Sequence, residues 1–196
     1  MELRKKLLLV TTSLIIVVVL CITILILYVK SYEVKISEYE LIYKTNVDLT
    51  ENQEKLAWFY YSEDKTYKYK YYPIFFDLLF LRPKSWGIPI ITSSYMIDNR
   101  KYKSHMEFSL VWYATMRYLI RNIDWRICLE YNLSYSHFGN NTYGLNEAAM
   151  NNYGKKVAEL SDLELIKLLL FTVSPTKYVQ NVQLLNERAE EIYNEY

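Results

Sequence analysis

Two glutamates, Glu63 and Glu107, have the residue type and the sequence surroundings that catalysis could use. Glu63 follows an apolar run at 56–61, and Glu107 stands near the start of an apolar segment where an uncharged residue would fit the pattern better. A positioned carboxylate can act as a general base. Each glutamate also has a purely structural explanation. Glu63 precedes Asp64 and Lys65 in what resembles a solvated turn, and the helix dipole favours a carboxylate in a first helical turn. These residues alone therefore leave catalysis undecided.

Residues 7–29 would hold such a site at a membrane. The stretch contains no charged residue, and about 23 residues at 1.5 Å each give a helix of roughly 34 Å, enough to cross a hydrocarbon core of about 30 Å. A cleaved signal peptide is the alternative, but it would have a shorter apolar region and a small-x-small site, which residues 29–32 lack. The basic cluster at 4–6 outweighs Lys30, so the positive-inside rule predicts a cytoplasmic tail at 1–6 and an external domain.

Charge and cysteine content exclude several classes of function. The net charge of the chain is only +1, whereas a nucleic-acid-binding protein needs a clustered basic face, so we expect no nucleic acid among the partners. Cys21 lies inside the apolar stretch and Cys128 stands alone beyond it. The sequence therefore supports neither a disulfide within the domain nor a metal site with several thiol ligands.

Helical patterns dominate after residue 49 and predict a single, mainly α domain over 50–196. Two capping boxes, Thr50–Gln53 and Ser161–Glu164, mark helix starts, and the second precedes an apolar helix that should end near Ser174-Pro175. The segment 104–121 is apolar nearly all round, which is typical of a helix buried in the middle of an all-α domain. Three shorter helices are expected, at 125–133, 145–152 and 182–193.

Two other segments have less regular patterns. Residues 31–48 alternate loosely between apolar and polar, which indicates an extended stretch within a juxtamembrane segment at 30–49. Residues 71–81 are strongly apolar with one charge, Asp77, and Gly87 and Pro89 add breaks to the chain that follows.

The C-terminal half carries a series of short motifs. Phe138 to Gly144 reads F-G-x-x-x-Y-G, preceded by Leu129-Glu130 and followed by Ala148-Ala149. The series continues with Tyr153-Gly154-Lys155, Glu159-Leu160, Glu164, Pro175 with Tyr178, and Arg188 with Ile192. No single piece is specific, but their order and spacing resemble the peptidoglycan glycosyltransferases. That family comprises the monofunctional transglycosylases and the N-terminal domains of class A penicillin-binding proteins.

The upstream half resembles the same family at three places, so the likeness covers about residues 55–193. Ser62–Tyr67 is similar to E-D-x-x-F-x-x-H-x-G, Gly87–Ser94 to G-G-S-T-I-T-Q-Q, and Lys103–Glu107 to R-K-x-x-E. The interval between Glu63 and Glu107 is shorter than in the family.

Several motif positions carry other residue types. The family's His and Gly are Lys70 and Tyr72, its paired Gln are Ser93 and Ser94, its Lys is Ser104, and its Tyr and Asn are Asn132 and Ser134.

The resemblance implies a lysozyme-like glycosyltransferase fold behind one transmembrane helix, at the bacterial cytoplasmic membrane with the domain on the outer or periplasmic side. It implies polymerisation of lipid II into glycan strands, with release of undecaprenyl pyrophosphate. Glu63 would be the general base, desolvated by Trp58, Phe59 and Tyr67, and Glu107 would act on the donor side through cations. The substrate-binding residues would be Asp64, Thr92, Ser93, Ser94, Arg100, Lys103, Glu130 and Arg188.

The implied partners are lipid II, the growing glycan strand, the membrane and other cell-wall synthesis proteins. A divalent cation, Mg²⁺ or Mn²⁺, is the one cofactor that this chemistry would admit. Residues 71–81 would be either an amphipathic segment in the membrane interface or an ordinary core helix. Two alternatives stay open for function: a catalytically inactive scaffold or glycan-binding protein of cell-wall assembly, and a lysozyme-like hydrolase.

Overall fold

The computed structural model describes residues 2–37, 47–63, 65–69, 87–96 and 104–196. Across these ranges the chain is mainly helical and forms no strand, only one isolated antiparallel bridge between His137 and Tyr143. The prediction of a mainly α protein is confirmed. The elements are α1 (Glu2–Ser37), α2 (Glu51–Ser62), α4 (Gly87–Met96), α5 (His105–Asn122), α6 (Trp125–Tyr135), α7 (Leu145–Tyr153), the 3₁₀ turn η3 (Val157–Glu159), α8 (Asp162–Val173), α9 (Pro175–Gln180) and α10 (Val182–Glu195).

α1 is the long apolar helix that the sequence predicts. Its stretch Leu8–Ser31 is long and apolar enough to cross a membrane, with a mean hydropathy of 3.0. The helix then continues to Ser37, so the expectation of an extended chain is wrong for residues 31–37. Elongating an existing helix costs far less than nucleating a new one, which explains why the weak alternation here does not break it. Residues 38–46 lie outside the described ranges.

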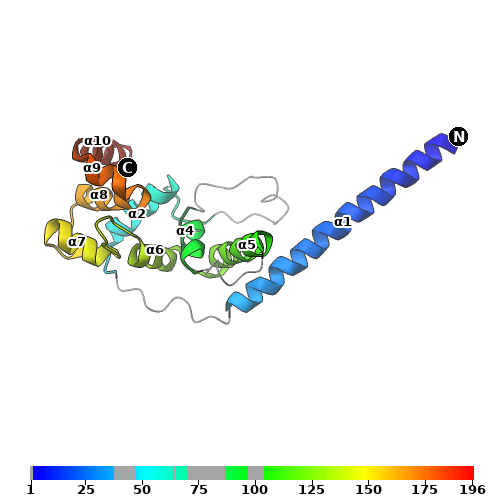
Figure 1. The fold of residues 1–196 in the computed structure, drawn as a ribbon, viewed down its shortest axis with the longest axis horizontal. Coiled ribbons are helices and arrows are strands. Elements are labelled where there is room, and N and C mark those ends of the chain that lie inside the picture. The colour runs from blue at the N-terminus through cyan, green and yellow to red at the C-terminus, as the bar shows by residue number, and fades with distance from the viewer. Residues whose placement is uncertain (1, 38–46, 64, 70–86, 97–103) are drawn as a thin grey trace.

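α8 is the centre of a bundle that α2 and the C-terminal helices form. α8 packs against α2, α7, α9 and α10, and four of its apolar side chains are fully buried, namely Leu165, Ile166, Leu168 and Leu169. Figure 1 shows α2 and α6 to α10 gathered at one end, α4 and α5 between, and α1 leading away. An aromatic cluster joins α2 to α6, where the rings of Trp58 and Trp125 meet edge to face at 4.9 Å.

Both predicted capping boxes form. Thr50 and Gln53 exchange side-chain and backbone hydrogen bonds at the start of α2, and Ser161 and Glu164 do the same at the start of α8. α8 also ends as predicted, with Ser174 as its C-cap. The sequence does not predict α9, which begins directly at Pro175, because a proline after a helix signals an end and equally suits the first position of the next helix.

α4 corrects the interpretation of Gly87 and Pro89 as breaks. Both residues belong to the first turn of this helix, where proline is tolerated because the first N–H groups have no helical partner. A Cβ on Gly87 would lie 2.5 Å from the Tyr61 carbonyl oxygen. Glycine therefore allows the start of α4 to approach the end of α2.

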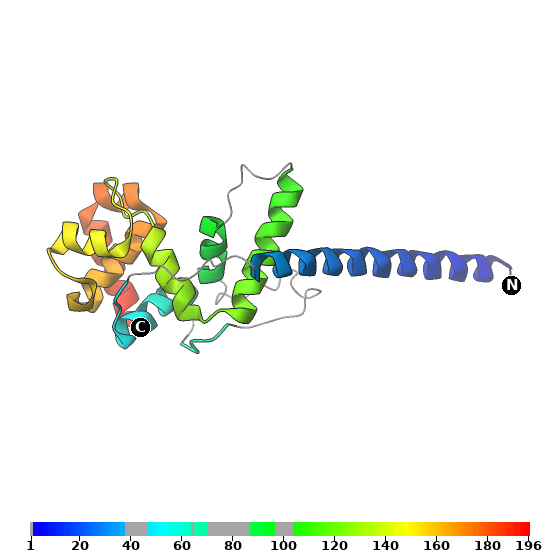
Figure 2. The same cartoon turned by 90° about the horizontal axis from the view of Figure 1, so that it is seen from below.

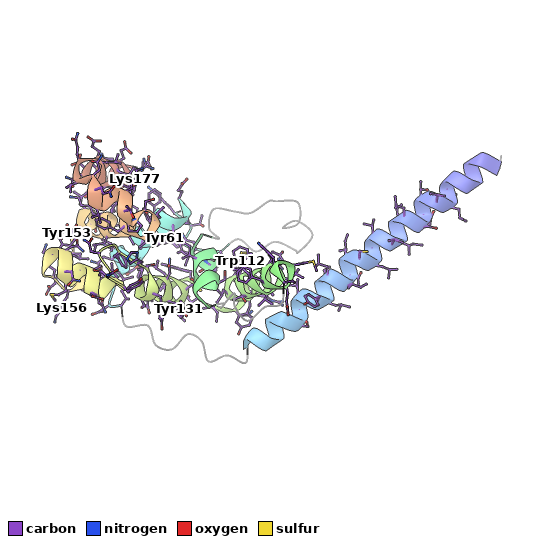
Figure 3. The ribbon with its side chains drawn as sticks, in the orientation of Figure 1. Tyr61, Trp112, Tyr131, Tyr153, Lys156 and Lys177 are labelled. Carbon is purple, nitrogen blue, oxygen red and sulfur yellow. The ribbon has the colours of Figure 1, made fainter. Side chains whose placement is uncertain are left out.

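α5 departs from its prediction as a central buried helix. Ala114, Met116 and Leu119 are fully buried, but Met106 is 73% exposed and Trp112 only half-buried. The helix lies between α4 and α1 and packs against both, as Figure 3 shows with Trp112 labelled. Its apolar character on several sides therefore reflects two different neighbours rather than a central position.

Candidate functional site

Glu63 closes α2. Its backbone is left-handed, with φ 50°, and its N–H donates to the Phe59 carbonyl oxygen at 2.7 Å. The side chain is exposed, whereas Trp58 and Phe59 point into the core. Glu63 is therefore exposed to solvent rather than enclosed by these rings, as the expected desolvation would require.

Glu107 lies in the first turn of α5, and its N–H donates to the capping Ser104 hydroxyl at 3.1 Å. The chain that follows Glu63 contacts α5 elsewhere, since Tyr69 packs on Met116 and Ile120. Met116 is nine residues beyond Glu107, about 14 Å along the helix. Figure 2 shows the end of α2 and the beginning of α5 at opposite sides of the domain. The described residues thus do not bring the two glutamates together.

Thr92 and Ser93 are enclosed between helices. They are 2% and 0% exposed, and the Thr92 hydroxyl lies 2.9 Å from the Ile88 carbonyl oxygen and 3.1 Å from that of Cys128. The Thr92 hydrogen bonds link α4 to α6. In the described part of the chain neither side chain reaches a surface, and the Thr92 hydroxyl bonds to backbone carbonyls; substrate binding by these residues stays a prediction.

The other predicted site residues are scattered. Glu130 lies half-buried in the middle of α6. Arg188 lies exposed on α10 and forms an ion pair with Glu191, which raises the pKa of the guanidinium further. Three predicted residues, Asp64, Arg100 and Lys103, lie outside the described residues, as do residues 71–81, and the side chain of Ser94 does too.

The F-G-x-x-x-Y-G motif forms a tight loop between α6 and α7. The Thr142 N–H donates to the Gly139 carbonyl oxygen at 2.8 Å, and the Gly144 N–H donates to that of Ser136 at 2.9 Å. Gly139 and Gly144 have φ angles of 84° and 83°. A Cβ on Gly144 would lie 2.9 Å from the backbone carbonyl oxygen of Ser134. Both conformation and space thus require glycine at position 144.

The Tyr-Gly-Lys motif and the later glutamate meet in space. Lys155 Nζ donates to both carboxylate oxygens of Glu164, at 2.6 and 2.9 Å. Glu164 also accepts the Ser161 N–H at 2.8 Å as part of the α8 cap. Lys155 and Ser161 together hold the pKa of Glu164 below its usual value. Two pieces of the motif series therefore form one structural unit.

A cavity that the sequence does not predict lies beside this loop. It has a volume of about 300 Å³, and its lining includes Tyr135, Tyr143, Asn146 and Glu147. The two tyrosines are 48% and 60% exposed. Exposed aromatic faces next to an amide and a carboxylate suit a polar ring such as a sugar, because the faces can stack while the polar groups orient it. Tyr143 belongs to the F-G-x-x-x-Y-G motif, but nothing in the sequence indicates that Tyr135, Asn146 and Glu147 line a cavity with it.

Among the described residues, no group of three or more His, Cys, Asp or Glu side chains could hold a metal ion.

No protein-family model matches the sequence, and a comparison with curated proteins finds no match either.

Proposed function

We propose that this chain is a membrane-anchored peptidoglycan glycosyltransferase of lysozyme-like fold, which polymerises lipid II on the outer face of the bacterial cytoplasmic membrane. The observation that carries the proposal is the contact of Lys155 with Glu164. These residues come from two separate pieces of the motif series, and each has a definite partner in the fold. The constrained glycines of the Phe138–Gly144 loop support the same assignment.

The proposed reaction needs a base and a way to stabilise the leaving group. A sugar hydroxyl of one lipid-linked disaccharide attacks the anomeric carbon of another, and the undecaprenyl pyrophosphate leaves with inversion. Glu63, exposed at the end of α2, accepts the proton from the attacking hydroxyl. By the family resemblance Glu107 would act on the donor side through cations at 100–103, which would meet the pyrophosphate charge; the described structure does not bring Glu107 close to Glu63. α1 holds the domain at the leaflet that supplies the substrate.

An inactive relative that binds glycan strands is the second candidate. Two observations favour it: the burial of Thr92 and Ser93, and the separation of Glu107 from the chain that follows Glu63. The cavity with Tyr135 and Tyr143 would serve glycan binding in either case.

Polymerisation of purified lipid II by the full chain in detergent micelles tests the first candidate. We expect glycan strands from the wild type and their loss in Glu63→Gln, since the amide cannot accept the proton. Glu190→Gln is the matched control, because Glu190 is an exposed glutamate on α10. The proposal fails if the wild type yields no strands or if Glu63→Gln yields as many.

Glycan binding distinguishes the second candidate. If the chain is an inactive binder, the wild type, Glu63→Gln and Glu107→Gln should all bind peptidoglycan strands equally well. Release of new reducing ends from peptidoglycan would instead identify a hydrolase.

A further inference from the structure

The C-terminal part of the membrane-spanning stretch is covered by α5. Val29 of α1 and Ala114 of α5 are both fully buried, and Leu25, Tyr113 and Tyr118 pack around them. Figure 2 shows α5 crossing this end of α1. The two helices therefore share a packed interface, so side-chain packing as well as the polypeptide joins α1 to the domain.

This interface lies within the apolar stretch rather than beyond it. Leu25 stands six residues before Ser31, where that stretch ends, so the contact begins about 9 Å inside the end. With α1 across a bilayer, the part of α5 that contacts it lies in the hydrocarbon region, close to the headgroups. Lipid would then contact those faces of the two helices that protein does not cover at this level.

An apolar stripe continues along α5 away from the interface. Met106, Leu110 and Tyr113 follow one another at helical spacing, and Tyr113 contacts the α1 interface directly. Met106 is 73% exposed and Leu110 is half-buried, whereas the neighbouring stripe carries the exposed polar residues His105 and Ser109. Such an arrangement is typical of a helix that lies in the plane of a membrane interface.

Aromatic and basic residues on α5 fit the same environment. Trp112, Tyr113 and Tyr118 are of the types that gather where acyl chains meet headgroups. Arg121 is exposed in the last turn, where it can meet lipid phosphate. Glu107 is the one acidic residue of this helix.

We propose that the Met106–Leu110–Tyr113 stripe of α5 is a second membrane contact, lying against lipid acyl chains beside α1. The occupant of this face is the bilayer itself, because the stripe is continuous with an interface that already lies at bilayer depth. This inference is independent of the proposed enzymatic activity.

Site-directed fluorescence in nanodiscs that hold one copy of the full chain tests the proposal. Met106→Cys is made in a Cys21→Ala background and labelled with an environment-sensitive NBD dye. Cys128 does not compete, since it is 1% exposed and burial raises the pKa of its thiol to about 12. Met150→Cys on α7 is the matched control, because Met150 is also an exposed methionine, at 54%.

We expect the emission at position 106 to be blue-shifted and to be lost when doxyl-labelled phosphatidylcholine replaces part of the lipid, with no loss at position 150. Equal emission at both positions, unaffected by the quencher, would place the stripe in water and overturn the proposal. Blue-shifted emission that the quencher leaves intact would also overturn it, since protein, such as a second copy of the chain, would then cover the stripe.

Discussion

At the scale of single residues, the loop between α6 and α7 contains several residues in an uncommon backbone conformation. Gly139, Asn140, Asn141 and Gly144 all have positive φ angles within six positions. Glycine and asparagine are the residue types that adopt this conformation at least cost. The loop can therefore hold the aromatic side chains of the neighbouring cavity in fixed positions.

Gly144→Ala should destabilise the protein more than Gly154→Ala. Both glycines have positive φ angles, 83° and 64°, but a Cβ at 144 would lie 2.9 Å from the Ser134 oxygen, whereas a Cβ at 154 would meet nothing within 4 Å. We expect a loss of about 2–3 kcal/mol in the free energy of unfolding for Gly144→Ala and about 1 kcal/mol for Gly154→Ala. Urea unfolding in detergent micelles, followed by circular dichroism, measures both, and equal losses would contradict the role of close packing.

At the scale of elements, side-chain hydrogen bonds and ion pairs gather at the start of α8. α8 begins with a capping box whose glutamate also pairs with Lys155, so one side chain connects the turn before η3 to the central helix. The Lys155 side chain is 40% exposed, which means that solvent screens the ion pair.

Glu164→Gln should remove a pH-dependent part of the stability. The folded protein lowers the pKa of Glu164 below its usual value of 4.5, so the stabilisation is present above pH 4.5 and is lost as the pH falls through the lower folded value. An amide can still accept the Ser161 N–H but carries no charge for Lys155. We expect the variant to lose about 1 kcal/mol at neutral pH, and the difference from wild type to shrink as the pH falls below 4.5.

Urea midpoints measured from neutral pH down to pH 3 check this expectation. Glu190→Gln, at an exposed position on α10, should show little change at any pH. A difference between Glu164→Gln and wild type that stayed constant with pH would point to packing instead of charge.

At the scale of the whole molecule, Gln53 joins parts of the chain that are more than a hundred residues apart. Its side chain is 3% exposed, and its Nε2 donates to the carbonyl oxygens of Val157 and Leu160 at 2.8 and 3.1 Å. Its Oε1 also accepts the Thr50 N–H as part of the α2 cap.

Gln53→Met should therefore destabilise the whole bundle. Methionine keeps a similar volume but leaves two buried carbonyls without their donor, which should cost about 2–3 kcal/mol. Gln183→Met is the control, because Gln183 is exposed and bonds only within α10, to Glu187. We expect the control to cost about 0.5 kcal/mol or less in the same urea experiment. Similar losses in the two variants would mean that the long-range bonds contribute little.

The sequence predicts those parts of the fold that depend on a few adjacent residues. The capping boxes at Thr50 and Ser161 locate α2 and α8 correctly, because a cap needs only four consecutive residues. Gly87 and Pro89 are harder to interpret, since both break a helix interior but suit a helix start. Only the neighbouring Tyr61 backbone shows why glycine occupies position 87.

Predictions fail where the answer depends on distant partners. Apolar periodicity shows that α5 has apolar sides, but not that α1 covers one of them. The motif likeness likewise does not show that Thr92 and Ser93 are buried, because their burial depends on how α4 meets α6. Whether Glu63 can act as a base depends on the same kind of long-range arrangement, and the sequence alone does not determine it.

The close packing of Val29 against Ala114 has a mechanical consequence. A helix longer than the local hydrocarbon thickness accommodates the mismatch by tilting, and the 24-residue stretch of α1 is about 36 Å long against a core of about 30 Å. If α1 spans a bilayer, its packing against α5 would transmit a change of tilt to α5 and to the helices attached to it. The thickness of the surrounding bilayer would then set the angle at which the domain faces the leaflet.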